Sequence, residues 1–336
     1  MPVDAETAVT LDLPDAVEVV AWHPAGRLLA AGDLSGTVAV VDADTGRAAL
    51  AVPDGHGPVS ALAWAPSGCC LAVGTVNGRI HLATPQGVRA LDAPGGITAL
   101  AWSPSGHVLA VGAGPTAHAV TAQGDRIGSL GPLAGTVQDL AWCAGPGPLA
   151  VAAGTAVLWC TPGASCEAVD RWAAKAQVRC LSPAPTGDAR LAAGDLGGTV
   201  RVLDAGTDDE VTVSGFTRRI ARLAWDPAGT RLAVPDEHAV TVWHLDGAQL
   251  ARDEPTWLTW HDDDVTDLAF GQVGGSTWLA SVDALGCLRA GRAEPAGPAL
   301  ALRIGRSSRC LRWRPGLPQV AVGDVDGEVR LVALSR

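Results

Sequence analysis

The sequence predicts an all-β protein built from eight tandem copies of one four-stranded unit of about 42 residues. Three observations support this prediction. One sequence motif recurs along the whole 336-residue chain, its copies are evenly spaced, and the composition favours tight turns over long helices. The chain has 41 Gly and 23 Pro but one Met and no Tyr, which is typical of a repeat protein made of short strands.

The recurring motif is apolar, any residue, small, Leu, Ala, Trp, any residue, Pro, any residue, Gly. Its aromatic position recurs at intervals of 38 to 45 residues. The eight positions are Trp22, Trp64, Trp102, Trp142, Pro183, Trp225, Phe270 and Trp313. Eight copies account for the full length, so we predict one domain over residues 1–336.

Each copy divides into strands at its turn signals, as the second copy illustrates. Val59 to Trp64 is predicted as the first strand, and Leu71 to Gly74 follows the turn at Pro66-Ser67-Gly68 as the second. Asn77-Gly78 predicts a hairpin turn, after which Arg79 to Ala83 forms the third strand. A more variable fourth strand precedes the next copy.

A four-stranded unit of this kind has apolar residues on both faces of its sheet, and a single unit would leave these faces exposed to solvent. A closed ring of eight such units, a β-propeller, would cover every face with a neighbour. The last copy supplies only three strands, at Cys310 to Trp313, Gln319 to Gly323 and Val329 to Leu334. We expect the segment Glu6 to Leu13, within residues 1–16, to be the missing fourth strand that closes the last blade. The alternative is a frayed N-terminus.

The copies resemble the WD-repeat (WD40) family of β-propellers, whose inner strand and following turn correspond to the recurring motif. The resemblance covers essentially the whole chain and implies four antiparallel strands per blade. Seven blades are commonest in the family, so seven is the alternative to eight. The family's Trp-Asp pair is absent, with Trp159-Cys160 and Trp243-His244 its nearest relatives. The Gly-His element survives as Gly55-His56 and more loosely at His261, so we expect the family's Asp, His, Ser/Thr and Trp network to be mostly missing.

One first-strand position, three residues before the aromatic one, changes character along the chain. It is Val or Ala in the first three copies and departs from them in the next five. These five residues, called the inner-strand slot below, are Asp139, Cys180, Arg222, Asp267 and Cys310. In the family's geometry this strand lines a central channel, where Asp139, Cys180, Asp267 and Cys310 could bind a transition metal. In the alternative, Arg222 neutralises an Asp between blades and the cysteines fill space.

A second position ends the second strand, at the start of the hairpin turn. Five of eight copies have Asp there. These turn aspartates are Asp33, Asp195, Asp236, Asp283 and Asp324. An Asp at the head of a turn caps backbone amides, which explains the recurrence without a ligand. By the family's geometry the same residues, with Asp262 to Asp264, would also form an acidic rim that attracts a basic partner.

Two further features stand outside these positions. His81 and His118 occupy matching places in the third strand, where other copies have Ala, Thr or Arg, so we predict a tolerant, partly exposed position. Trp257 and Trp260 lie in the longest segment between copies, Gly247 to Asp264, which is a candidate contact loop. The alternative for these tryptophans is packing on an outer strand.

The composition limits the classes of partner. A formal net charge of −11 repels phosphate backbones and anionic lipid, so we expect no nucleic-acid or membrane partner. No run of about 18 apolar residues predicts a membrane span. Without an export signal, the eight scattered cysteines are expected to be reduced thiols in a cytoplasmic, monomeric protein.

Catalytic motifs are missing from the sequence, which has no GxSxG, no GxxxxGK[ST] and no HExxH. We therefore predict a non-catalytic scaffold, without a cofactor, that presents its propeller rim to a protein partner. The alternative is a propeller that binds a metal or a small molecule at its channel, in a chaperone-like or enzymatic role.

Overall fold

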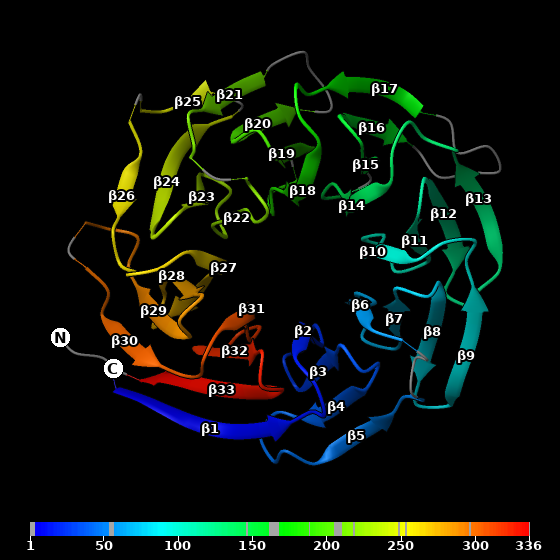
Figure 1. Ribbon diagram of the computed structural model, residues 1–336, viewed down its shortest axis with the longest axis horizontal. Helices are drawn as coiled ribbons and strands as arrows, with labels where there is room; N and C mark the ends of the chain where they lie inside the picture. Colours follow the sequence, from blue (N-terminus) through cyan, green and yellow to red (C-terminus); the bar gives the residue numbers. More distant parts are fainter. Residues whose placement is uncertain are drawn as a thin grey trace. The chain divides into compact units, whose positions relative to one another are not determined.

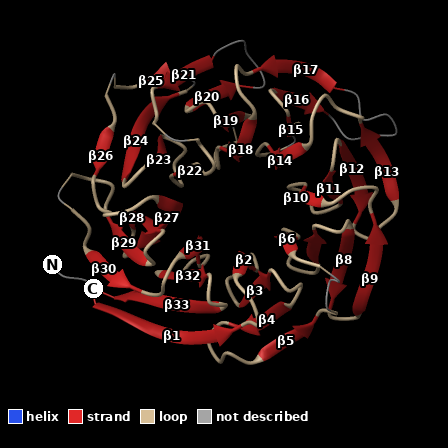
Figure 2. Ribbon diagram, in the orientation of Figure 1, coloured by secondary structure: helices blue, strands red, loops and turns tan. Residues whose placement is uncertain are grey.

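The structure is a computed structural model that describes residues 4–53, 57–145, 147–160, 168–187, 189–204, 210–217, 219–247, 249–252, 254–295 and 297–335. Within these residues every helix or strand present is a β-strand (Figure 2). The strands form eight antiparallel sheets, so the predicted eight-bladed β-propeller is confirmed and the alternative of seven blades is wrong. Backbone contacts group blades 2 to 5 into one compact unit and blades 1, 6, 7 and 8 into another.

The first unit comprises Gly55–Leu223 with Gly247–Gln249, and the strands of each blade follow chain order (Figure 1). Blade 2 consists of β6 (Val59–Trp64), β7 (Leu71–Thr75), β8 (Arg79–Thr84) and β9 (Gly87–Asp92). Blade 3 consists of β10 (Ile97–Trp102), β11 (Val108–Ala113), β12 (Thr116–Thr121) and β13 (Arg126–Leu130). Blade 4 consists of β14 (Val137–Trp142), β15 (Leu149–Ala153), β16 (Ala156–Cys160) and β17 (Ala168–Ala173). Blade 5 consists of β18 (Val178–Pro183), β19 (Arg190–Asp195), β20 (Thr199–Asp204) and β21 (Glu210–Ser214).

The second unit comprises Met1–Asp54, Ala224–Asp246 and Leu250–Arg336. Blade 1 consists of β2 (Val17–Trp22), β3 (Leu28–Asp33), β4 (Val38–Asp42) and β5 (Ala48–Ala51). Blade 6 consists of β22 (Ala224–Trp225), β23 (Arg231–Asp236), β24 (Ala239–Asp246), β25 (Gln249–Leu250) and β26 (Thr256–Leu258), which pairs with β24. Blade 7 consists of β27 (Val265–Val273), β28 (Ser276–Asp283), β29 (Cys287–Gly291) and β30 (Leu300–Arg303). Blade 8 consists of β31 (Ser308–Trp313), β32 (Gln319–Asp324), β33 (Glu328–Ser335) and β1 (Asp4–Asp12).

The N-terminal strand completes blade 8. β1 pairs antiparallel with β33 along its whole length, and the two ends of the chain lie side by side as blue and red strands in Figure 1. The next residue inward, Leu13, is buried, and its backbone N–H donates to the carbonyl of Gly327 at 2.8 Å. The predicted closing strand is therefore confirmed, and a frayed N-terminus is wrong for the described residues.

Four of the recurring tryptophans bond their blade to the one before it. In the first unit the indole N–H of Trp102 donates to the carbonyl of Ala63 at 3.0 Å. In the second unit the indole N–H of Trp313 donates to the carbonyl of Ala269 at 2.8 Å. Two more tryptophans make the equivalent bond, Trp22 and Trp142. The ring thus packs between blades while its polar N–H keeps a partner, which explains why this residue type repeats.

A glycine just before the turn position lets the next blade approach closely. A Cβ on Gly74 would lie 2.5 Å from Cγ2 of Ile97, the first residue of the next blade. A Cβ on Gly323 would lie 2.6 Å from Cγ1 of Val17. Because Val and Ile are stiff at this branch point, neither can move aside cheaply. A small residue facing a β-branched one is therefore the rule at this contact.

Blades 7 and 8 reverse this rule. The glycine position of blade 7 is Val282, and the first residue of blade 8 is Ser308. Both are fully buried, and the hydroxyl of Thr266 lies within hydrogen-bond distance of both of their backbone carbonyls, at 3.2 and 2.6 Å. The Ser308 hydroxyl itself has no hydrogen-bond partner among the described residues. We interpret the pair as an exchange of side-chain sizes. The larger residue, Val282, lies on the preceding blade, and the smaller one, Ser308, lies on the following blade.

This exchange predicts strong coupling between the two positions. Ser308→Val should destabilise the protein by about 1–3 kcal/mol through overpacking, although it removes an unpaired hydroxyl. Val282→Gly should also destabilise it, because it leaves a cavity. Thermal denaturation of both single variants and the double variant should show the double variant closer to wild type than the sum of the singles. Additive losses would contradict the exchange.

Blade 6 differs from the repeat at its first strand. The copy that starts at Ile220 predicts a six-residue strand, but β22 begins only at Ala224. In the other seven blades, the residue three places before the aromatic position pairs with the residue at the glycine position, as Ala61 does with Gly74. In blade 6 the glycine position is occupied by Pro235, which has no backbone N–H to donate. The strand pairing therefore stops short of the slot.

Candidate functional site

The two aspartates of the inner-strand slot are hydrogen-bond acceptors that join successive blades. Asp139 accepts the backbone N–H groups of Leu140, in its own strand, and of Leu181 in β18, both at 2.8 Å. Asp267 accepts the equivalent pair of bonds, the one from the next blade coming from Leu311 at 2.9 Å. Each carboxylate thus accepts hydrogen bonds from backbone amides in the first strands of two successive blades.

A β-bulge places these side chains. The pairing register shifts immediately before Asp139 in β14 and before Asp267 in β27, and such a shift re-aims the following side chain. Burial raises the pKa of Asp139, while its two backbone N–H bonds and the charge of Arg222 act to lower it. The guanidinium of Arg312 donates to Asp267 at 2.8 Å. Arg312, in blade 8, therefore pairs with the slot aspartate Asp267, and the charge of Arg222 acts on Asp139.

The remaining slot residues differ in exposure. Arg222 is exposed, and its guanidinium donates to the carbonyl of Ala221 at 3.1 Å. Cys180 and Cys310 are buried, and the Cys180 thiol donates to the carbonyl of Ile220 at 3.5 Å. Burial raises the pKa of Cys180 to about 12, so the thiol is protonated at neutral pH.

The metal hypothesis for Asp139, Cys180, Asp267 and Cys310 divides between the two units, since the first two belong to one unit and the last two to the other. Among the described residues, no group of three or more His, Cys, Asp or Glu side chains is arranged to hold a metal ion. The hypothesis stays a prediction.

The turn aspartates cap their own hairpins. Asp195, for example, accepts the backbone N–H groups of Gly197 at 2.8 Å and Thr199 at 3.0 Å. Three others, Asp33, Asp283 and Asp324, make the same bonds to the amides two to four residues onward. These four residues are at most 4% exposed, and Asp236 is half-buried. Their carboxylates point into the turns, as the capping interpretation expects, and their role in a partner-binding rim stays a prediction.

Exposed aliphatic side chains lie on these same turns. Val76 is 47% exposed, Leu196 40% and Leu285 41%. The turn is also anchored at its backbone, because the N–H of Val76 donates to Pro58 and that of Leu196 to Gln177, each just before the blade's first strand. Sequence reasoning missed these residues. The signal was an aliphatic residue one or two places after the turn position, where turns usually have Gly, Asn, Asp or Ser.

Blade 7 retains a buried polar network around His261. Its Nδ1 lies 2.9 Å from a carboxylate oxygen of Asp283, and its Nε2 lies 2.7 Å from the Ser281 hydroxyl. All three side chains are buried, and burial lowers the pKa of His261. The family's Asp, His and Ser/Thr partners are therefore together in this blade, where the sequence has the looser counterpart His261. Gly55-His56 lies outside the described residues.

Two other sequence interpretations need correction or refinement. The prediction of a partly exposed position at His81 and His118 is wrong, because both side chains are buried under neighbouring elements. In the candidate contact loop, Trp257 lies on β26 and is 53% exposed, whereas Trp260 is buried. Asp262 has an exposed side chain that lies 3.9 Å from the guanidinium of Arg289.

Comparison with known proteins supports the repeat assignment. Residues 9–42, 48–82 and 86–116 match the WD40 family, described as WD domain, G-beta repeat. A search of curated proteins gives no match. A crystal structure of the computationally designed Ika8 protein superposes with a TM-score of 0.79 at 19% identity, over 97% of this chain and 98% of that one. At this identity the likeness shows the fold alone.

The matched stretches begin in β1 and extend through blades 1 and 2 into blade 3. Among the other five blades, four are four-stranded sheets and blade 6 has a fifth strand, β26. In the described part of the chain, no helix is long and apolar enough to cross a membrane. The protein is an eight-bladed β-propeller that carries WD40 repeats.

Proposed function

We propose that this protein is a non-catalytic scaffold that binds a protein partner through its second-to-third-strand hairpin turns. The observation that supports the proposal is the repeated pairing of a buried turn cap with an exposed aliphatic side chain. An aspartate or threonine holds the turn, as Asp195 does through two amides, and the next residues present Val76, Leu196 or Leu285 to solvent. WD40 propellers commonly bind proteins, which agrees with this use.

The turn cap and the aliphatic residue have separate roles in this proposal. The cap reduces the freedom of the turn before binding, so less conformational entropy is lost when a partner docks. The aliphatic side chain supplies apolar area that a partner can cover. The net charge of −11 adds long-range attraction for a basic partner and predicts binding that weakens as salt is raised.

The test compares matched exposed residues at two kinds of turn. Val76→Asp combined with Leu196→Asp places charges on two hairpin turns of one unit. Leu317→Asp is the control, because Leu317 is also 47% exposed but lies in the turn between β31 and β32, at the opposite end of its strands. All three proteins are immobilised, exposed to extract of the source cells, and their bound proteins quantified by mass spectrometry.

We expect wild type and the Leu317 variant to retain the same partner, and the double variant to lose it by about tenfold or more, as at an interface hot spot. The partner should elute as salt is raised and should carry a basic surface. Equal capture by the double variant and wild type would contradict the proposal.

A further inference from the structure

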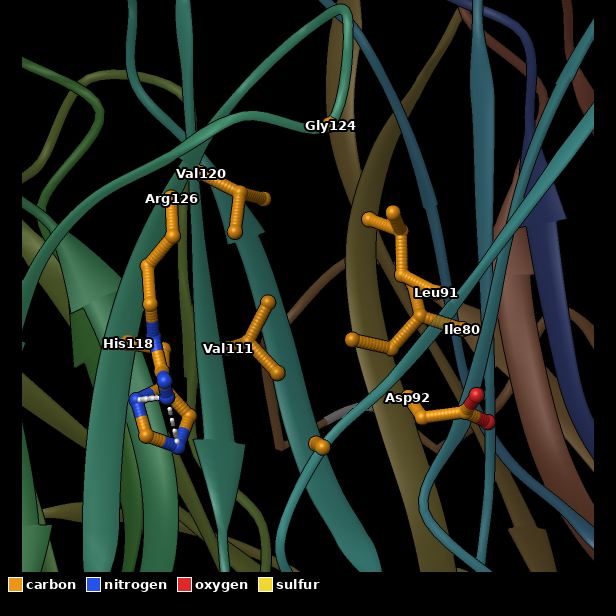
Figure 3. Close-up of a pocket in the computed structure, with 9 residues that line it drawn as sticks. Ile80, Leu91, Asp92, Val111, His118, Val120, Gly124 and Arg126 are labelled. Atoms are coloured by element: carbon orange, nitrogen blue, oxygen red, sulfur yellow. Dashed lines mark hydrogen bonds between the residues drawn. The ribbon is translucent and has the colours of Figure 1, made fainter.

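A small cavity lies between the outer parts of blades 2 and 3. Its volume is about 140 Å³, and its residues come from β8, β9, β11, β12, β13 and the turns beside them (Figure 3). Ile80, Val111 and Val120 form buried apolar walls, and Leu91 is half-buried. Engineered apolar cavities of about 150 Å³ take up benzene, so this space suits a compact apolar group of similar size.

The cavity has one cationic side. Arg126 is exposed at its rim, and Nη2 of its guanidinium lies 3.0 Å from Nε2 of His118 and close to Nδ1 of the same ring. Figure 3 shows the guanidinium lying against this imidazole. Among the described residues no carboxylate pairs with Arg126. A guanidinium has five N–H donors, so most of this one remains available to an incoming acceptor.

His118 does not add a second positive charge. The ring is buried, and burial together with the charge of Arg126 lowers the pKa of His118 to about 4. At neutral pH the imidazole is therefore neutral and can accept from Arg126. The cationic side of the cavity carries a single charge, held in place by a neutral ring.

The opposite side of the cavity is acidic. Asp92, on β9, lines it and faces across the apolar walls from His118 and Arg126 (Figure 3). Its carboxylate accepts from Arg79 at 2.7 Å, so its charge already has a partner outside the cavity. A ligand with one carboxylate could place it at Arg126, whereas a second carboxylate at the far end would meet Asp92.

We propose that this cavity is a binding site for a compact monocarboxylate, with its apolar body between blades 2 and 3 and its carboxylate on Arg126. Guanidinium and carboxylate match in shape and can form two parallel hydrogen bonds, which fixes the orientation of the ligand. The site is separate from the hairpin turns and does not depend on the proposed scaffold function.

The test uses benzoate as the probe, by isothermal titration and by the NMR signal of the His118 ring. Benzoate should bind saturably to one site and raise the pKa of His118, because it neutralises the nearby positive charge. Benzamide has the same shape without the charge and should bind about tenfold more weakly or worse. Terephthalate, with a second carboxylate facing Asp92, should also bind about tenfold more weakly.

Three variants separate charge from shape. Arg126→Gln should weaken benzoate at least about tenfold. Arg89→Gln is the matched control, because Arg89 is an exposed arginine of β9 that pairs with Asp125 and does not line the cavity, so binding should change by less than about twofold. Ala93→Leu fills the cavity without changing any charge and should abolish binding. Non-saturable binding by wild type, equal binding of benzamide, or unchanged binding by Arg126→Gln would overturn the proposal.

Discussion

Deletion of residues 1–13 is expected to lower the melting temperature by about 10 °C and to make the protein aggregate. The deletion removes β1, whose backbone pairs with β33 from Asp4 to Asp12, and it removes the buried side chain of Leu13. Loss of one buried leucine costs about 1.5–3 kcal/mol, and the lost strand pairing adds to it. At about 2–4 °C per kcal/mol for a large domain, the sum reaches this shift.

Aggregation follows from the edge that the deletion exposes. Without β1, the full length of β33 presents unpaired N–H and C=O groups, which can template pairing with a second chain. Light scattering during a thermal scan measures both effects together. Deletion of residues 1–3 alone is the control, because β1 begins at Asp4 and should pair as before. A 1–13 deletion that melts and scatters like this control would show that β1 is dispensable.

Asp267→Ala is expected to destabilise the protein by about 3–5 kcal/mol, which is large for a single substitution. The carboxylate is 1% exposed and accepts from two backbone amides and from Arg312. Alanine would leave the buried N–H of Leu311 without this acceptor in the contact between blades 7 and 8, and an unsatisfied buried donor costs about 1–3 kcal/mol. Chemical denaturation measures the loss.

The control for this substitution is another aspartate of the same blade. Asp262 has a side chain that is 88% exposed, and its contact with Arg289 is 3.9 Å long, so Asp262→Ala should change stability by less than about 0.5 kcal/mol. Asp139→Ala should resemble Asp267→Ala, because Asp139 makes the same two amide bonds between blades 4 and 5. A small effect at Asp267 would mean that water replaces the carboxylate at this contact.

The number of blades and most strand bounds could be predicted because packing repeats. Within each unit, successive blades bury equivalent faces against one another, so the constraint appears in the sequence as a period. Even the weak copies around Pro183 and Phe270 form complete blades. The exception at Pro235 shows the limit of this reasoning. Its missing N–H shortens the pairing of β22, a consequence that depends on which residue lies opposite.

The candidate sites were predicted only in part. Exceptions to the repeat did locate Asp139 and Asp267. Their partners are the backbone amides of Leu181 and Leu311, which lie 42 and 44 residues onward and have no sequence signature. His118 was predicted to be partly exposed, because one strand's pattern does not reveal what covers it. In the structure Arg126, from the next strand, contacts the ring.

The sequence by itself determined the all-β class, the eight blades, the closing strand and the capped turns, because each depends on local turn chemistry or on a period that recurs along the chain. Only the tertiary structure decided which slot residues are bonded across blades, which turn residues face solvent, and that Ile80, Leu91 and His118 surround one cavity. The physical reason is that these properties belong to contacts between blades. Such a contact depends on two side chains from distant segments, as the exchange of Val282 and Ser308 illustrates.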